Sequence, residues 1–273
     1  PTPSKSQRSY RRVLTIAGSD SGGGAGIQAD LKTFAALGCY GASAITAITA
    51  QNTVGVRGVS MVPVAMVVAQ IEAVADDLPV RAVKTGMLGD ASIVEAVAEA
   101  LARRALGPVV VDPVMVAKSG DRLLDPGAVA AVRARLLPLA TVVTPNLPEA
   151  EVLCGFAIRS TADAREAARR LHGDGASAVI VKGGHGAGET LIDLLFDGTT
   201  FHEFPTPRIA TANTHGTGCT FASAVAAWLA LGASIDEATA RAQHYVAGAI
   251  RHALPLGAGH GPLRHDWMQA TAR

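Results

Sequence analysis

From residue 13 the sequence reads Val13-Leu14-Thr15-Ile16-Ala17-Gly18-Ser19-Asp20-Ser21-Gly22-Gly23-Gly24-Ala25-Gly26 and continues into the segment Ile27 to Leu37. The first five residues are apolar or β-branched and predict a short strand. Ile27, Leu31 and Phe34 recur at helical spacing and predict a helix with one apolar face. A strand, a glycine-rich loop and a helix in this order open an α/β unit, whose loop lies at the carboxyl edge of the sheet, where such folds bind ligands.

The glycines of this loop fit neither of the two familiar nucleotide-binding signatures. A P-loop requires Gly-Lys followed by Ser or Thr, but Gly26 is followed by Ile27. A dinucleotide fingerprint requires G-x-G-x-x-G, which these glycines do not supply, and this disfavours an NAD-linked oxidoreductase. Two interpretations stay open, a close approach of the backbone to a ligand and a plain tight turn.

Apolar strands and amphipathic helices follow along the rest of the chain. Strands are predicted over 40–50, 82–85, 108–111, 141–144 and 178–181, with a hairpin formed by 191–196 and 200–204. Helices are predicted over 63–78, 90–106, 125–137, 161–171 and 221–229. Ser234 and Glu237 predict a capping box for a last helix that ends near His252. Strands that are apolar throughout are typical of parallel sheets covered on both faces.

The composition indicates one globular domain. Of the 273 residues 49% are hydrophobic and 17% charged, and we expect a single domain over 13–273 after a disordered tail over 1–12. Aromatic residues are only 4% and the net charge is +1, which argues against a nucleic-acid partner. No apolar run is long enough for a membrane span. Cys39, Cys154 and Cys219 are too few and too scattered for a disulfide framework or metal knuckle, which indicates a cytoplasmic protein.

Polar side chains follow several of the predicted strands. Asp112 ends the strand 108–111, a usual place for a metal ligand or catalytic carboxylate. Asn146 and Glu149 have a three-residue spacing in the first turn of a helix, so their oxygens could bind a water-rich Mg²⁺ or simply cap that helix. Gln51 carries a donor and an acceptor on one amide, which can bind a ring that presents an amine beside a ring nitrogen.

The run Thr211-Ala212-Asn213-Thr214-His215-Gly216-Thr217-Gly218-Cys219 precedes the predicted helix 221–229. A glycine turn that opens a helix leaves backbone amides unpaired at the positive end of the helix dipole, and such a helix start can bind an anion. Cys219 lies in the first turn, where a thiol pKa tends to fall, so it could act as a base. The alternative is an ordinary helix start with a small buried cysteine.

Several blocks together resemble one protein family. They are Thr15 to Phe34, Ala50-Gln51-Asn52, Lys84-Thr85-Gly86-Met87-Leu88, Asp112-Pro113-Val114-Met115, Ala117-Lys118-Ser119-Gly120, Thr144 to Ala150, Lys182-Gly183-Gly184-His185 and Asn213 to Thr220. In this order, and over nearly the whole chain from Val13, they resemble the bacterial hydroxymethylpyrimidine/phosphomethylpyrimidine kinases of the ribokinase superfamily. The resemblance implies a three-layer α/β/α sandwich with a central, mostly parallel sheet. It also implies two ATP-dependent steps of thiamine synthesis, which convert 4-amino-5-hydroxymethyl-2-methylpyrimidine to its monophosphate and then to its diphosphate.

The resemblance also implies roles for individual residues. Gln51 would bind the aminopyrimidine edge, and the rest of that pocket would comprise Gly18, Ala25, Asp30, Met87 and Val114. Asp112 and Glu149 would hold Mg²⁺, with Asn146 orienting the phosphates. The nucleotide would contact Lys182, Gly183 and Gly184. The amides of Gly216, Thr217 and Gly218 would stabilise the transferred group beside Cys219, which stands where many ribokinase relatives have Asp.

A lowered thiol pKa would let Cys219 take the proton of the alcohol in the first step, whereas the second acceptor is already an anion. We therefore hypothesise that Cys219→Ala harms the first step more than the second. The implied cofactors are ATP and Mg²⁺, a monovalent cation is left open, and the family implies a homodimer. Two alternatives remain, a pyridoxine/pyridoxal kinase of the same superfamily and a catalytically inactive ligand-binding domain.

Overall fold

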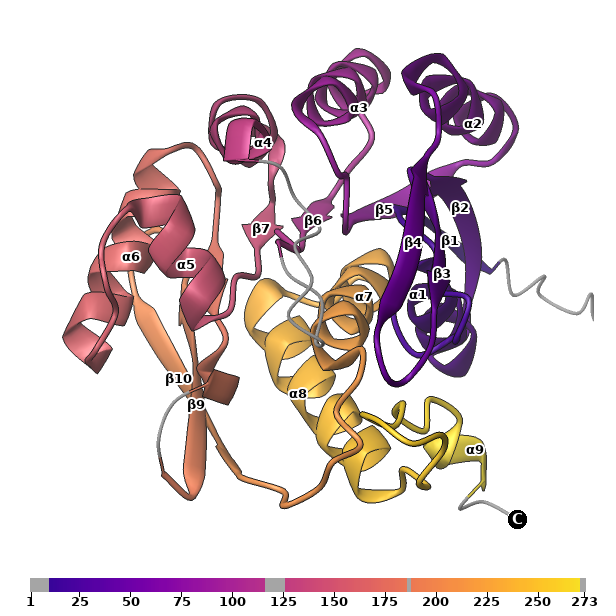
Figure 1. The fold of residues 1–273 in the computed structure, drawn as a ribbon. Coiled ribbons are helices and arrows are strands. Elements are labelled where there is room, and N and C mark those ends of the chain that lie inside the picture. The colour runs from indigo at the N-terminus through magenta and orange to yellow at the C-terminus, as the bar shows by residue number, and fades with distance from the viewer. Residues whose placement is uncertain (1–9, 116–125, 186–187, 271–273) are drawn as a thin grey trace, which may run out of the picture.

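The computed structural model describes residues 10–115, 126–185 and 188–270 (Figure 1). Its main sheet is built from β1 (Arg11–Ala17), β2 (Cys39–Ile45), β5 (Val80–Thr85), β6 (Val109–Val111), β7 (Val142–Val143), β8 (Val179–Val181), β9 (Thr190–Phe196) and β10 (Phe201–Pro207). The strand order is β10-β9-β8-β7-β6-β5-β1-β2. Neighbouring strands are parallel from β2 to β8, and β9 is antiparallel to both of its neighbours. The predicted α/β fold with a mostly parallel sheet is confirmed.

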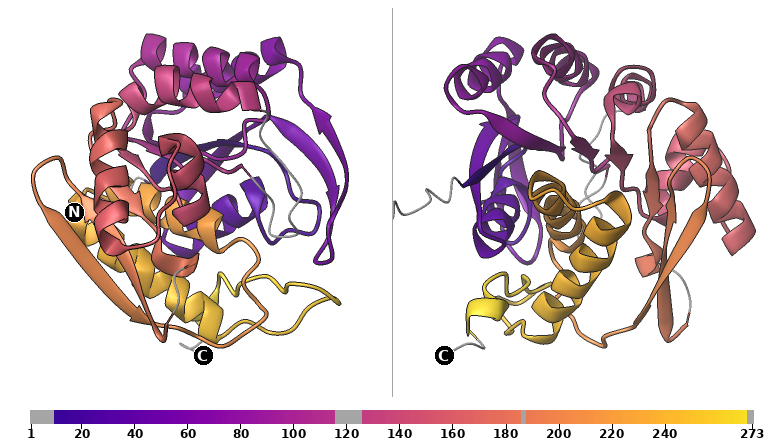
Figure 2. Two further views of the ribbon diagram at one scale, coloured as in Figure 1. Left: turned by 60° about the vertical axis from the view of Figure 1, so that its left-hand side comes forward. Right: turned by 180° about the vertical axis from the view of Figure 1, so that it is seen from behind.

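Helices cover both faces of this sheet and form two hydrophobic cores (Figure 2). One face packs against α1 (Gly26–Ala36), α7 (Thr217–Ala230) and α8 (Ile235–Arg251). The other packs against α2 (Val64–Asp77), α3 (Ala91–Arg104), α4 (Pro126–Ala131), α5 (Leu147–Cys154) and α6 (Thr161–Gly173). A short helix, α9 (Trp267–Ala270), follows near the end of the chain. The result is the three-layer sandwich that the sequence analysis expects.

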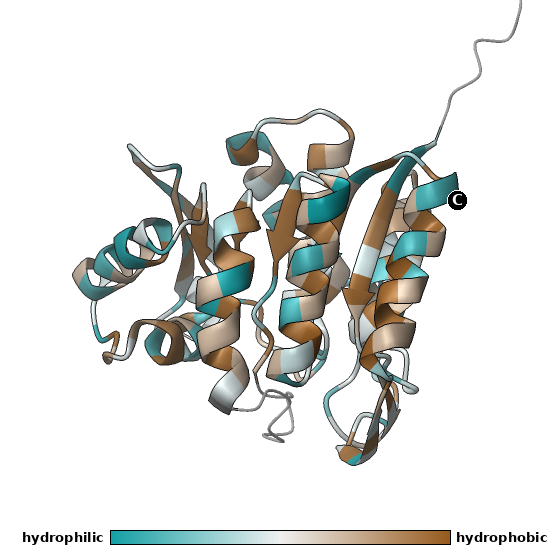
Figure 3. Ribbon diagram, turned by 90° about the horizontal axis from the view of Figure 1, so that it is seen from above, coloured by the Kyte–Doolittle hydropathy of each residue, from teal (hydrophilic) through white to brown (hydrophobic). Residues whose placement is uncertain are grey.

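The central strands show why the sheet is mostly parallel. Val109, Val110 and Val111 are each at most 3% exposed, because helices cover both faces of β6. Strands of this kind are apolar over their whole length, and in Figure 3 they are brown between helices that carry both colours. No helix among the described residues is both long and apolar enough to cross a membrane.

The segment 40–50 is not one strand. β2 ends at Ile45, and the chain continues as β3 (Ala47–Gln51), which pairs only with β4 (Val56–Met61) in a separate two-stranded sheet. Between them Thr46 is fully buried, and its hydroxyl donates a 2.7 Å hydrogen bond to the Met87 carbonyl. The pattern of apolar residues continues through this change of partner, which is why the sequence analysis missed both the break and β4.

Other boundaries also differ. Arg11 and Arg12 belong to β1 and pair with Cys39 and Tyr40, so the tail expected over 1–12 is wrong at its last two residues. Residues 1–9 of that tail lie outside the described residues, as does the block 117–120. The helix expected over 125–137 consists of α4, one π-helical turn at Val132–Leu136 and a 3₁₀ turn at Leu137–Leu139. The capping box of Ser234 and Glu237 is confirmed.

Candidate active site

Two loops that are far apart in the sequence meet at the carboxyl edge of the sheet, one after β1 and one before α7. Asp20 in the first loop is only 2% exposed. Its carboxylate accepts hydrogen bonds from the amides of Gly22, Gly24 and Ala25 at 2.8, 3.0 and 2.8 Å. Its Oδ2 also lies 2.8 Å from Nε2 of His215 in the second loop. Burial by itself raises the pKa of Asp20, but the bonds from His215 and these amides hold that pKa below its usual range.

The second loop brings unpaired amides to this junction. Gly216 precedes α7 with φ of 81°, and a Cβ at this position would lie 1.8 Å from the Gly24 carbonyl oxygen, so no other residue fits. The Thr217 amide is bonded to Thr214 at 3.4 Å, and the Thr220 amide to Gly216 at 2.9 Å. Among the described residues this leaves the amides of Gly218 and Cys219 without an acceptor. The helix begins at Thr217, before the predicted range 221–229, and Cys219 lies in its first turn as the sequence predicts. This helix start has the chemistry of an anion site.

Cys219 lies in the first turn of α7, where the nearby Gly26 amide lowers the pKa of its thiol. Burial raises the pKa of this thiol to about 11, even though the positive charge of Lys84 lowers it. The expectation of a lowered pKa is therefore wrong for the protein without ligands. The local effect of a helix start is smaller here than the loss of water around the sulfur.

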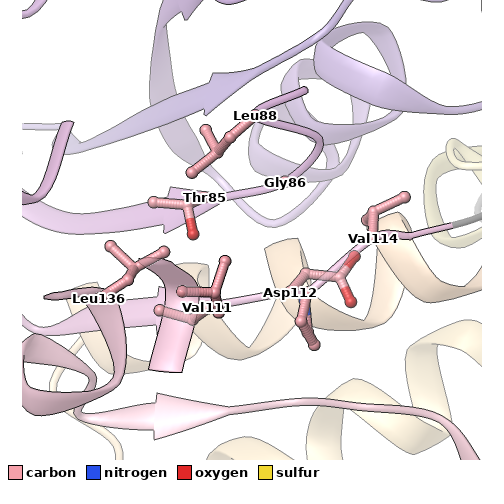
Figure 4. Close-up of a pocket in the computed structure, with 9 residues that line it drawn as sticks. Thr85, Gly86, Leu88, Val111, Asp112, Val114 and Leu136 are labelled. Atoms are coloured by element: carbon pink, nitrogen blue, oxygen red, sulfur yellow. The ribbon is translucent and has the colours of Figure 1, made fainter. Parts of the chain in front are cut away.

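Asp112 follows β6 and is 1% exposed. Its Oδ1 accepts a 2.9 Å hydrogen bond from Lys182 Nζ and one of 3.3 Å from the Thr144 hydroxyl. Its Oδ2 has no partner among the described residues. Figure 4 shows Asp112 and Val114 after β6 and Thr85 on the neighbouring strand, where all three line one small pocket. An unpartnered buried carboxylate oxygen at a strand end suits a cation.

Asn146 and Glu149 form the helix cap that the sequence analysis kept as an alternative. The Asn146 side chain accepts from the Glu149 amide at 2.9 Å, and Glu149 Oε2 accepts from the Asn146 amide at 2.8 Å. Burial and the charge of Asp112 raise the pKa of Glu149 to about 7, against the lowering effect of Lys182. The described residues contain no group of three or more His, Cys, Asp or Glu side chains that could hold a metal ion.

Lys182 connects the acids to the anion site. Its Nζ, bonded to Asp112, lies 3.3 Å from where a Cβ on Gly218 would stand. The two glycines after Lys182 differ from each other. Gly183 donates its amide to Asp193 Oδ1 at 2.8 Å, and a Cβ there would lie 2.1 Å from the Ile192 carbonyl oxygen. A Cβ on Gly184 would meet open space, so of the two glycines Gly184 has more room for a contact with the nucleotide.

The residues expected to form the pyrimidine pocket lie mostly around the first loop. The Gly18 amide donates to the Met87 carbonyl at 3.1 Å, and a Cβ on Gly18 would lie 2.8 Å from Met87 Cε. Gln51 ends β3, where its backbone N–H donates to the Ser21 hydroxyl at 2.8 Å and its backbone carbonyl accepts from that hydroxyl at 2.7 Å. Ala25, next to Gly26, donates its backbone amide to the Asp20 carboxylate. The structure thus brings Gln51, Gly18, Ala25 and Met87 to one loop.

Asp30 does not line this pocket. It has no exposed surface, and both of its oxygens are bonded to other protein groups. A direct contact with a substrate, as the resemblance implies, is therefore wrong for this structure, because the turn of α1 places Asp30 beneath the loop. The sequence analysis also missed Asp20 and His215. The only local signal was an acid among glycines that needed an acceptor for their amides.

The fold and the site together define the class of protein. A mostly parallel sheet between two helical layers, with a glycine-rich loop and an amide-lined helix start at its edge, is a ribokinase-like α/β protein. The family model for phosphomethylpyrimidine kinase matches residues 20–264. The chain therefore belongs to the phosphomethylpyrimidine kinase family.

Individual relatives agree with this family. The chain is 58% identical over 253 residues to the thiamine biosynthesis bifunctional protein ThiED of Geobacter sulfurreducens, a match that covers 93% of this chain and 52% of that protein. The chain thus spans about half the length of that relative. It is 54% identical to the hydroxymethylpyrimidine/phosphomethylpyrimidine kinase of Streptomyces coelicolor, over 93% of this chain and 94% of the relative. A solved ADP complex of Bacillus subtilis pyridoxal kinase superposes with a TM-score of 0.89 at 41% identity, covering 96% and 99% of the two chains.

Proposed function

We propose that this chain uses ATP to phosphorylate 4-amino-5-hydroxymethyl-2-methylpyrimidine, and then phosphorylates the monophosphate to the diphosphate. The family and the names of the similar proteins from Geobacter sulfurreducens and Streptomyces coelicolor support this activity. The ADP complex of the similar pyridoxal kinase supports ATP as the donor.

One observation carries the proposal, the contact between His215 and Asp20. It joins the loop that holds Gln51 through Ser21 to the helix start that presents the Gly218 and Cys219 amides. A ring bound at Gln51 and an anion bound at α7 would therefore share one space at the edge of the sheet. Transfer of a phosphoryl group requires this arrangement, because its main demands are alignment and neutralisation of charge.

In the first step the hydroxymethyl oxygen attacks the γ-phosphorus of ATP. The bond from that phosphorus to the bridging oxygen breaks, ADP leaves, and the hydroxyl proton passes to a base, the role proposed for Cys219 as its thiolate. The amides of Gly218 and Cys219 and the ammonium of Lys182 would stabilise the charge on the transferred group. In the second step the acceptor is a phosphate oxygen that is already ionised, so the demand for a base is smaller.

The acidic groups fit a divalent cation. Asp112 has an oxygen without a partner, and burial of Glu149 beside it makes a second negative charge costly. When bound, Mg²⁺ would supply a positive charge that neutralises phosphate oxygens. Asp112 and Glu149 would hold it, and Lys182 balances part of their charge in its absence. A monovalent cation remains an expectation from the resemblance.

A second candidate is phosphorylation of pyridoxal, and the similarity to the Bacillus subtilis pyridoxal kinase favours it. Gln51 suits an aminopyrimidine edge, which pyridoxal lacks. The test is an assay that follows monophosphate and diphosphate separately, with hydroxymethylpyrimidine or pyridoxal as acceptor. We expect both pyrimidine products, and a higher kcat/KM for the pyrimidine than for pyridoxal. ATP consumption only with pyridoxal would exclude the proposal, and no consumption with either would favour a binding domain.

We also propose a homodimer in the cytoplasm. The two-stranded sheet of β3 and β4 exposes Ile48 and Val59 by 58% and 49%, and apolar side chains of this kind are often covered by a second subunit. The three cysteines are free thiols, as in proteins of reducing compartments. Light scattering on the purified chain tests the dimer. A mass of one chain at micromolar concentration would exclude it.

A further inference from the structure

A buried ion pair lies beneath the start of α7, and the proposed reaction has no role for it. Lys84 on β5 and Asp30 on α1 have no exposed surface, and Lys84 Nζ lies 3.0 and 2.9 Å from the two carboxylate oxygens. Two hydroxyls complete the cluster. Thr15 donates to Asp30 Oδ2 and Ser223 to Oδ1, both at 2.6 Å. Such a pair gives little net stability, because removing two charges from water costs about as much as their attraction returns.

The spacing along two helices places this pair next to Cys219. Gly26 and Asp30 are four residues apart on α1, and Cys219 and Ser223 are four residues apart on α7. Residues at this spacing are neighbours on one helix face. The Gly26 amide is near the Cys219 sulfur, and one turn deeper the Ser223 hydroxyl donates to Asp30. The Lys84 ammonium, which Asp30 holds, is therefore one helical turn below the thiol.

We propose that Lys84 is a positioning residue whose fixed ammonium stabilises negative charge on the Cys219 sulfur, and that Asp30 limits this effect. The reason for burying the pair is then electrostatic. An ammonium without water around it acts strongly over a few ångström, because the surrounding protein screens it poorly. Cys219 is the candidate base of the proposed phosphotransfer, so the purpose of this effect rests on the proposed function. The test of the effect does not need phosphotransfer.

Four charged groups face Cys219, each from a different element. Lys84 comes from β5, Asp30 from α1, Asp112 from the end of β6 and Lys182 from the end of β8. The charge of Lys84 lowers the pKa of the thiol, and those of Asp112 and Asp30 raise it. Removing Lys84 and removing Asp30 should therefore have opposite effects on the thiolate population. A purely structural role for the pair would not produce opposite signs.

The test measures how fast iodoacetamide alkylates Cys219 between pH 7 and 10.5 in the full chain without substrates, read by mass spectrometry of the Cys219 peptide. In Lys84→Met we expect alkylation at pH 8 to be slower by about tenfold, since one pKa unit is a factor of ten in thiolate. In Asp30→Asn we expect it to be faster, but only by about threefold, because Asp30 has the smaller effect on this thiol. Ser223→Ala, which changes no charge, is the matched control and should stay within about twofold of the wild type.

Folding is followed in the same experiment, because Cys39 and Cys154 are buried and react only when the chain opens. If Lys84→Met exposes them, the double variant Lys84→Met/Asp30→Asn removes both charges and still tests the inference. It should slow Cys219 alkylation, but by less than tenfold, because Lys84 has the larger effect. Folded variants with unchanged rates, or single variants that shift in the same direction, would overturn the proposal. Since no substrate is present, loss of phosphotransfer activity would not affect this result.

Discussion

His215 Nε2 lies 2.8 Å from Asp20 Oδ2, and this contact spans 195 positions of the sequence. It fixes the start of α7 against the glycine-rich loop that follows β1. The contact is buried at both ends, with side-chain exposures of 9% and 2%. The geometry of the candidate site therefore depends on one carboxylate that no local pattern singles out from its neighbours in the sequence.

Replacing this carboxylate tests how far the junction depends on it. In Asp20→Asn an NH₂ group faces donors from its own loop, so we expect the free energy of unfolding to fall by about 2–4 kcal/mol. Urea denaturation measures this change. The control is Asp90→Asn, because Asp90 caps α3 by accepting from the Ile93 amide and the Ser92 hydroxyl, and asparagine, which keeps an acceptor oxygen, should cost less than about 1 kcal/mol. Equal losses of stability in the two variants would show that the contact between the two loops stabilises the fold no more than an ordinary helix cap.

The two glycines around the anion site give a second, matched comparison. Gly216→Ala requires a positive φ and places a Cβ 1.8 Å from the Gly24 carbonyl oxygen, so we expect a loss of more than about 2 kcal/mol in stability. Gly218→Ala meets only the flexible end of Lys182, at 3.3 Å. Its stability should stay within about 1 kcal/mol of the wild type, since Ala suits a helix.

The readout that separates the two variants is the KM for ATP together with the melting temperature. We expect Gly218→Ala to keep its melting temperature and to raise the KM, because the added methyl group displaces the Lys182 ammonium from the amides. If Gly216→Ala melted like the wild type, the close packing of the two loops would be refuted.

The sequence predicted those features that depend on neighbours along the chain. The capping box of Ser234 and Glu237 and the start of α7 after Gly216 are set within a few residues, and the structure has both. Asn146 and Glu149 matched two patterns, a helix cap and a pair of oxygen ligands. The cap is present in the structure, and the metal remains a proposal.

Features that depend on tertiary contacts could not be predicted in this way. The helix start favours a lower thiol pKa at Cys219, but the side chains packed around it from other elements reverse the sign. The resemblance places Asp30 in the substrate pocket, yet one turn of α1 carries it to the buried side next to Lys84. β4 pairs with the strand that ends at Gln51, and this pairing could not be predicted from the residues of β4 either.

The acid sensitivity of the fold should depend on His265. This side chain is 6% exposed, and its Nε2 lies 3.0 Å from the hydroxyl of Thr220 in α7. Burial, and after it the charge of Lys32, lower the pKa of His265 to about 4 from 6.5. Above pH 6.5 the imidazole is neutral in both states. As the pH falls toward 4 only the unfolded chain takes up a proton, so acid favours unfolding.

We expect His265 to reduce the free energy of unfolding by about 2 kcal/mol between pH 7.5 and pH 5. In His265→Gln this part of the pH dependence should disappear, because glutamine does not titrate. Urea denaturation at the two pH values measures the difference, with His244→Gln on the exposed side of α8 as the control. An equal pH dependence in wild type and His265→Gln would contradict the assignment.

Cys219→Ala separates the two phosphorylation steps. In the protein without ligands burial raises the pKa of this thiol to about 11 despite the charge of Lys84, so a base is available only if the bound substrates favour the thiolate further. General-base help is typically worth about 10²–10⁴ in rate, and the alcohol of the first step needs it. The phosphate acceptor of the second step does not. We therefore expect Cys219→Ala to lower kcat of the first step by at least about tenfold more than that of the second.

The measurement uses the two acceptors separately, hydroxymethylpyrimidine for the first step and its monophosphate for the second, at saturating ATP. Cys219→Ser is the control for shape, since its hydroxyl keeps the volume but is a much weaker acid than the thiol. If serine restored the first step fully, the side chain would act by filling space beside the Gly218 amide. Equal losses in both steps for Cys219→Ala would lead to the same conclusion, because alignment of the phosphoryl group is common to the two reactions whereas removal of an alcohol proton belongs to one.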